Sequence, residues 1–181
     1  MDMHEEEHHD EDEDHDEEEH EEGHDDHGGL ILANYLQEDA ELDGYELEIG
    51  RVFNLASGDL EVSFSRDVVN GSLSSGMNIP RMSPARNIYS VGYSVNDYLF
   101  DLSFKDVDSQ TDTAEEESAT SGYQMLDAKL VRTFDLNGSS LRVSVFASNL
   151  LDEVARNHAS FVKNQVPLPG KNFGLRFNLS F

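Results

Sequence analysis

The sequence contains no cysteine among its 181 residues. Disulfides, thiolate metal sites and cysteine nucleophiles are therefore excluded, although this absence says nothing about the cellular compartment. Long apolar runs are also missing, and the longest uninterrupted one is Leu30 to Ala33. A transmembrane helix needs about 20 apolar residues, so none is encoded, and the N-terminus lacks the basic region and apolar core of a signal peptide. A protein without such a helix can still span a membrane as a β-barrel, whose strands alternate between apolar and polar side chains.

Basic residues are absent from one end of the chain. Residues 1–27 contain 17 Asp or Glu and no Lys or Arg, so they carry most of the formal net charge of −26. The remaining residues, 28–181, hold 21 acidic and 12 basic side chains. Such an imbalance repels phosphates, so we expect no nucleic-acid partner. It favours cations as partners instead.

The acidic stretch from His4 to His27, HEEEHHDEDEDHDEEEHEEGHDDH, has no apolar or basic side chain. Nothing in residues 1–29 can offset the entropy of ordering, so we predict a disordered segment there. Neutral imidazole with carboxylate suits Zn²⁺ and, less selectively, Cu²⁺, Ni²⁺ or Co²⁺. The repetition predicts many weak, interchangeable metal sites, and a merely solvating spacer is the alternative. The candidate ligands are His4, His8, His9, His15, His20, His24 and His27.

After Gly28 and Gly29 the apolar residues recur with period two, which predicts strands. The clearest strand is the last, where Phe173, Leu175, Phe177, Leu179 and Phe181 share one face and polar residues the other. Similar alternation predicts strands within residues 45–49, 60–65, 89–95, 98–105, 123–134 and 141–148. No helical period of comparable strength is present.

The predicted connections alternate in length. Short turns with Asn, Asp or Gly chemistry lie at residues 55–59, 95–97 and 135–139, and long polar loops at about 70–86, 109–122 and 150–171. This pattern is typical of outer-membrane barrel hairpins, but a soluble sandwich or lipocalin-like barrel would also alternate. Two features favour the membrane barrel: the chain stops on Phe181 after an alternating strand, and the polar face carries charges that suit a wet lumen.

The C-terminal residues resemble a known family. Asn149-Leu150-Leu151-Asp152, the ARNH motif of residues 155–158, and the PLPGKNF motif of residues 167–173 resemble the closing segment of TonB-dependent outer-membrane receptors. The DGYELE motif of residues 43–48 resembles an earlier strand of that family. The His- and acid-rich stretch ahead of that strand resembles an extracellular loop of the zinc-uptake subgroup of this family.

The resemblance implies an all-β fold, a segment of an antiparallel transmembrane β-barrel with about seven or eight strands, in the cell outer membrane. Family members close a barrel of about 22 strands around an N-terminal plug. We therefore expect a C-terminal fragment, with residues 1–29 an extracellular loop and residues 30–181 the barrel part. The resemblance also implies that residues 30–53 form one long strand. Its implied partners are outer-membrane lipid, divalent metal ions, and the remaining barrel and plug, with TonB reached only through that plug. Zinc, a similar divalent cation or a siderophore-type metal complex would be transported cargo rather than a cofactor.

Other polar residues are weaker candidates. His158 is either a ligand in a lumenal metal site or a simple hydrogen-bonding group. We expect Asp112, Glu115, Glu116 and Glu117 to be extracellular surface, and Glu46, Glu48, Glu61, Asp101 and Asp127 to pair with Arg142, Arg176 or Lys105 across strands. No catalytic arrangement is evident, so we predict no enzyme. The remaining alternative to a receptor is a soluble all-β metal-binding or interaction protein with an acidic tail.

Overall fold

The computed structural model describes residues 37–181, which form one all-β unit. No helix in this part of the chain is long and apolar enough to cross a membrane. The predicted disorder of residues 1–29, their seven candidate histidines and the domain boundary after residue 29 lie outside the described residues.

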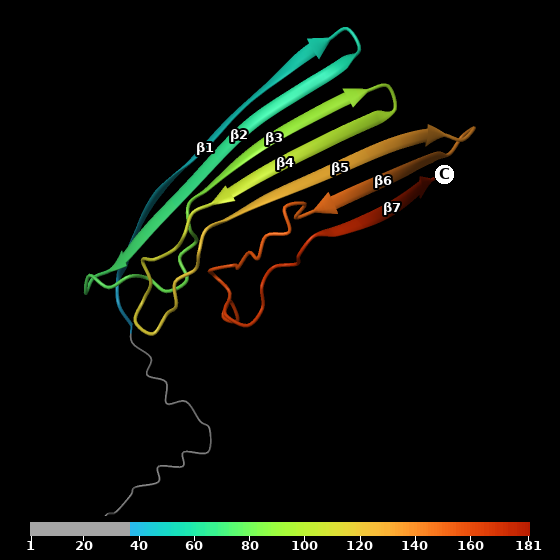
Figure 1. The fold of residues 1–181 in the computed structure, drawn as a ribbon. Coiled ribbons are helices and arrows are strands. Elements are labelled where there is room, and N and C mark those ends of the chain that lie inside the picture. Colours follow the sequence, from blue (N-terminus) through green and yellow to red (C-terminus); the bar gives the residue numbers. More distant parts are fainter. Residues whose placement is uncertain (1–36) are drawn as a thin grey trace, which may run out of the picture. The chain divides into compact units, whose positions relative to one another are not determined.

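Seven strands make a single sheet in which every neighbouring pair is antiparallel and chain order equals spatial order (Figure 1). This confirms the predicted all-β antiparallel fold class. The long strand predicted within residues 30–53 is found from residue 40 onward. The strands are β1 (Ala40–Leu55), β2 (Gly58–Leu73), β3 (Arg86–Val95), β4 (Tyr98–Val107), β5 (Tyr123–Asp135), β6 (Ser140–Ser148) and β7 (Asn172–Ser180).

The connections alternate as predicted. Tight turns join β1 to β2, β3 to β4 and β5 to β6 at one end of the sheet, and three long loops gather at the other end (Figure 1). Asn96 and Asn137 have positive φ values of 48° and 52°, which asparagine tolerates better than most residues. We name the long connections loop A (residues 74–85), loop B (residues 108–122) and loop C (residues 149–171).

One face of the sheet is apolar across all seven strands. Because cross-strand partners share a face, the register aligns whole rows of apolar side chains. One row runs from β2 to β7 through Leu60, Tyr93, Phe100, Leu130, Val145 and Leu175. Many of these side chains remain exposed, with Phe173, Leu175 and Phe177 at 71%, 64% and 65%. The predicted apolar face of the last strand is therefore confirmed.

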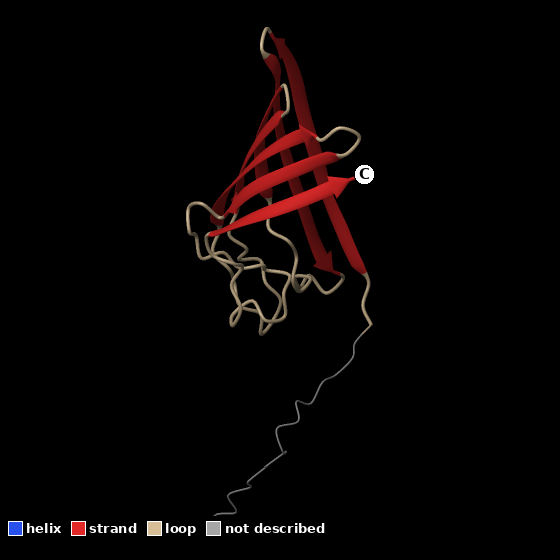
Figure 2. Ribbon diagram, turned by 90° about the vertical axis from the view of Figure 1, so that its right-hand side faces the viewer, coloured by secondary structure: helices blue, strands red, loops and turns tan. Residues whose placement is uncertain are grey.

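The opposite, polar face carries the most buried positions of the sheet. Val107, Met125, Val131 and Ser144 are at most 9% exposed, and all four lie on this face. On β7, a Cβ atom at Gly174 would collide with the Phe146 ring of β6, so glycine is required for that ring to lie there. The greater burial of side chains on this face indicates that it is the concave side of the sheet, whose curvature is visible in Figure 2.

The sheet stays open within the described residues. β1 and β7 each pair with one neighbour only, so both have an unpaired edge. Unpaired edges and a large exposed apolar face are both association surfaces. The outward apolar and inward polar arrangement is the reverse of a soluble sandwich, which buries its apolar face.

Candidate functional site: the loop cluster around His158

The three long loops are tied together at one end of the sheet, and this is the most buried polar region of the described residues. Asn78 of loop A donates to the Thr113 carbonyl of loop B at 3.0 Å. Ser118 of loop B donates to Asn164 of loop C at 3.0 Å. The Arg81 guanidinium of loop A lies 3.6 Å over the Phe161 ring of loop C. Each loop therefore restrains the other two.

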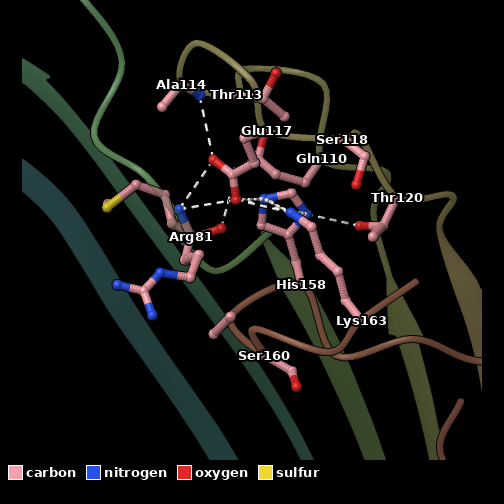
Figure 3. Close-up of polar contacts among 12 residues, drawn as sticks. Arg81, Gln110, Thr113, Ala114, Glu117, Ser118, Thr120, His158, Ser160 and Lys163 are labelled. Atoms are coloured by element: carbon pink, nitrogen blue, oxygen red, sulfur yellow. Dashed lines mark hydrogen bonds and ion pairs between the residues drawn. The ribbon is translucent and has the colours of Figure 1, made fainter. Parts of the chain in front are cut away.

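Glu117 of loop B lies at the centre of these contacts (Figure 3). Its carboxylate accepts the Arg81 backbone N–H at 3.0 and 3.1 Å and the Ala114 backbone N–H at 3.2 Å. It also accepts a charge-assisted hydrogen bond from Lys163 Nζ at 2.7 Å. Burial alone would raise the pKa of Glu117, but the Lys163 ammonium and the two backbone donors outweigh it and lower the pKa to about 2. Glu117 is therefore ionised throughout the physiological range.

His158 of loop C is buried beside this carboxylate, with 2% of its surface exposed. Its Nε2 lies 3.1 Å from Glu117 Oε1, and its Nδ1 lies 2.9 Å from the Thr120 hydroxyl. Burial lowers the pKa of His158, and the Lys163 ammonium lowers it further, against the opposite effect of Glu117. The imidazole is then neutral, with Nε2–H donating to Glu117 and Nδ1 accepting from Thr120.

The Thr120 hydroxyl, the His158 imidazole and the Glu117 carboxylate follow one another in the order found in a catalytic triad. The surroundings of these three groups nevertheless indicate a structural role. Thr120 is only 6% exposed, so no substrate reaches its hydroxyl from solvent. Lys163 Nζ lies 3.3 Å from His158 Nε2, where its charge opposes protonation of the ring. The cluster therefore holds loops B and C together as a satisfied hydrogen-bond network.

The structure thus brings together residues that the sequence did not connect. Glu117 was expected on the surface with Asp112, Glu115 and Glu116; those three are exposed, whereas the Glu117 side chain is 9% exposed and the expectation is wrong for it. Thr120 and Lys163 had no sequence signal, because neither has a spacing relationship to Glu117. Their proximity depends on how two adjacent hairpin loops fold over one another.

For His158 the structure finds the hydrogen-bonding role that the sequence allowed. Within residues 37–181 no three His, Cys, Asp or Glu side chains gather as a metal site would require. A cation at His158 would also face the Lys163 ammonium. Metal binding at His158 stays a prediction that this geometry does not favour.

The Asn149-to-Asp152 motif fixes both ends of loop C. Asn149 is 1% exposed and has a positive φ of 51°. Its side chain accepts the Glu153 backbone N–H at 2.9 Å and donates to the Glu153 and Pro169 carbonyls at 2.9 and 3.2 Å. Asp152 accepts the Lys171 backbone N–H at 2.9 Å. These two residues therefore close the loop directly above β6 and β7.

Ion pairs do cross strands on the concave face, but with other partners than predicted. Asp101 pairs with Lys129 at 3.2 Å, and Asp67 pairs with Arg86 at 2.6 Å. The register explains both pairs, because Asp101 of β4 lies directly opposite Lys129 of β5, and Asp67 of β2 lies directly opposite Arg86 of β3. Asp127, also expected to pair with a cation, accepts the Asn149 backbone N–H at 2.8 Å instead.

Comparison with known proteins adds one finding. No family model matches the sequence, and no curated protein matches it. Among solved structures, the fold is similar to that of a chain described as copper transporter OprC, with a TM-score of 0.71 and 18% sequence identity. The match covers 80% of this chain and 24% of the OprC chain, so this chain spans about a quarter of that structure. At this identity the likeness establishes the fold alone, an antiparallel sheet of the kind that forms a β-barrel wall.

Proposed function

We propose that the chain is part of an outer-membrane receptor of the TonB-dependent type, which takes up zinc or a similar divalent metal. The chain would form a segment of the barrel wall, with its convex face toward lipid and its concave face toward the lumen. Loops A, B and C would lie on the extracellular side. The rest of the barrel and a plug would be partners, and TonB would act only through the plug.

The observation that carries this proposal is the continuous apolar convex face. Apolar side chains in register cross all the strands, and exposed patches of this extent mark interaction or membrane surfaces. A soluble all-β protein would turn the same rows inward. The likeness in fold to a copper transporter supports a role in metal transport.

The metal part of the proposal depends on the histidine-rich stretch. Seven imidazoles among sixteen carboxylates in residues 4–27 exceed what solvation needs. The negative field would attract divalent cations by diffusion, and imidazole nitrogens would select zinc-like ions over Ca²⁺. Capture outside the barrel would raise the local metal concentration at its mouth.

The proposal is tested by zinc titration of the full chain, folded in detergent micelles, using calorimetry. Replacing His4, His8, His9, His15, His20, His24 and His27 with Gln keeps the charge and removes the nitrogen ligands. We expect zinc affinity to fall at least tenfold while Ca²⁺ binding persists, and wild-type zinc binding to fade as pH drops through about 6.5. The matched control His158→Gln should keep zinc binding. Unchanged zinc binding in the sevenfold variant would reject metal capture by imidazole.

A further inference from the structure

Two arginines lie on the apolar convex face, close to the end of the sheet where the tight turns gather (Figure 1). The register places Arg51 of β1 and Arg132 of β5 within the apolar rows, and both residues are exposed. At roughly 3.3 Å per residue, each lies within about 13 Å of the end of its strand, at Leu55 and Asp135 respectively. In a barrel wall, a charge at this height reaches the lipid–water interface, where it costs far less than at the bilayer midplane.

The charge at this end of the convex face is opposite to that of the chain. The chain has 38 Asp and Glu against 12 Lys and Arg. The acidic residues that the strands place on the convex face are Glu41, Asp43 and Asp106, and all three lie near the end that carries the long loops. Within residues 37–181, neither Arg51 nor Arg132 forms an ion pair with a carboxylate. In this part of the chain, both charges are therefore available to a ligand.

Aromatic rings hold both guanidinium groups in place. The Arg132 Cζ lies 4.9 Å from the centre of the Tyr98 ring and 4.4 Å from that of the Phe134 ring. The Arg51 Cζ lies 4.9 Å from the centre of the Phe53 ring. Contacts with rings do not use up the N–H donors, and within the described residues neither guanidinium donates a hydrogen bond to the protein. A positioned guanidinium with open donors matches a phosphate group, which it binds through two parallel hydrogen bonds.

An apolar groove begins next to Arg132 on the same face. It has a volume of about 440 Å³ and runs over Ala128 and Ala147, which lie opposite one another on β5 and β6. The larger side chains around these two alanines are those of Tyr93, Phe100, Leu102, Leu130, Val145 and Phe173. Leu130 precedes Arg132 by two positions and shares its face, so the groove reaches the arginine. An apolar groove of this size suits part of an acyl chain.

We propose that this end of the convex face is a binding site for anionic phospholipid. Arg132 would bind the phosphate of a lipid whose acyl chain lies in the groove, and Arg51 would bind a second headgroup. The inference rests on the proposed barrel-wall function and names the lipid that the wall selects. A zwitterionic headgroup carries an ammonium beside its phosphate, which the arginines would repel. A second copy of the chain fits less well, because two copies inserted in the same direction would bring the same arginines together.

The test is native mass spectrometry of the full chain, folded in micelles of an uncharged detergent. The chain is titrated with phosphatidylglycerol and, separately, with phosphatidylcholine of the same acyl chains. We expect phosphatidylglycerol to bind about tenfold more tightly, although the net charge of −26 alone would favour the opposite order. Arg132→Gln should weaken phosphatidylglycerol binding about tenfold and leave phosphatidylcholine binding unchanged. Arg51→Gln should weaken the second bound phosphatidylglycerol in the same way.

Arg142→Gln is the matched control for the charge. Arg142 lies near the same end of the sheet but on the concave face, opposite Asn178 of β7, so its loss should not alter lipid binding. The double variant Ala128→Leu and Ala147→Leu is the control for the groove, because it fills the groove and keeps the arginines. It should weaken both lipids to the same extent. Inorganic phosphate, which has no acyl chain, should not displace bound phosphatidylglycerol.

Several outcomes would overturn the proposal. It fails if the wild-type chain binds both lipids equally, or if Arg132→Gln and Arg142→Gln weaken phosphatidylglycerol binding equally. Displacement by inorganic phosphate would also reject it, since the arginines would then bind a free ion. Dimers of the wild-type chain that disappear in Arg132→Gln would assign the surface to a second copy. Insertion into vesicles of phosphatidylcholine alone tests the barrel-wall role without any anionic lipid, so failure of either proposal is distinguishable from failure of the other.

Discussion

Lys163 and Glu117 lie 46 residues apart in the chain, yet Lys163 Nζ donates to Glu117 Oε1 at 2.7 Å. Both side chains are at least nine-tenths buried, with 7% and 9% exposed. A buried pair of this kind contributes little net stability relative to an apolar pair, but it is costly to break from one side. It therefore fixes one arrangement of loops B and C and penalises others.

Glu117→Gln should open this arrangement. The substitution keeps the shape but leaves the Lys163 ammonium buried without its counter-charge, which costs on the order of 3 kcal/mol. Hydrogen exchange of amides in loops B and C should then accelerate by roughly 100-fold, with the strands unaffected. Glu116→Gln, an exposed neighbour, is the matched control and should leave exchange unchanged. Equal exchange in both variants would contradict a central role for Glu117.

The loop cluster should also loosen in acid, in two stages. The pKa of His158 is lowered by burial, so its contribution is complete above its ordinary value of 6.5 and is lost as pH falls below it. The pKa of Glu117 is lowered to about 2, so its contribution is complete above 4.5 and is lost between 4.5 and about 2. Both groups bind a proton less readily in the folded state than in the unfolded state, so acid destabilises the loop cluster. Amide exchange in loops B and C, measured relative to the strands from pH 7 to pH 3, should show both stages.

The variant His158→Gln separates these stages. It removes the titrating imidazole, so the change between pH 6.5 and 4.5 should disappear while the lower stage remains. Persistence of the upper stage in this variant would assign it to another group.

The sheet could be predicted from the sequence because its determinants are local. Alternation along Phe173, Leu175 and Phe177 fixes which side chains share a face, and turn residues such as Asn96 and Asn137 fix where hairpins reverse. Short turns fix the register of β1 with β2, of β3 with β4 and of β5 with β6, whereas the long loops leave the other three registers to the matching of apolar faces. Charged residues were less predictable, since Asp101 pairs with Lys129 only because of the register between β4 and β5.

The loop cluster could not be predicted in the same way. Glu117 is the last of three consecutive glutamates that all look like surface residues, but only the other two, Glu115 and Glu116, are exposed. What distinguishes Glu117 is the backbone N–H of Arg81 and the ammonium of Lys163, which come from two other loops. Irregular loops have no period, so the sequence carries no signal for these contacts.

Asn149 should be more important to loop C than its side-chain size suggests. Asn149→Ala removes three hydrogen bonds to the Glu153 and Pro169 backbone and leaves buried groups unsatisfied, at a cost of about 2 kcal/mol. Asn149→Asp keeps the acceptor for the Glu153 N–H but loses both donors, so its effect should also be destabilising. Limited proteolysis within residues 149–171 measures the opening. Loop C as resistant in both variants as in wild type would contradict this role.

The membrane orientation of the sheet is tested by introducing one charge on either face. Leu175→Lys places an ammonium on the convex apolar face, where Leu175 is 64% exposed and pairs with Val145. In a bilayer such a substitution costs up to about 2–4 kcal/mol near the midplane. We expect the fraction of chain that migrates as a heat-modifiable folded species, after refolding into lipid vesicles, to fall strongly.

Asn178→Lys is the matched control, because Asn178 lies on the concave face of the same strand opposite Arg142. A lysine there would face water in a lumen, so the folded fraction should stay close to wild type, apart from mild repulsion by Arg142. The physical contrast is between two positions on one nine-residue strand that differ in the face they present. If Leu175→Lys folds as well as Asn178→Lys in vesicles, the convex face does not contact lipid, and the proposed barrel-wall role is wrong.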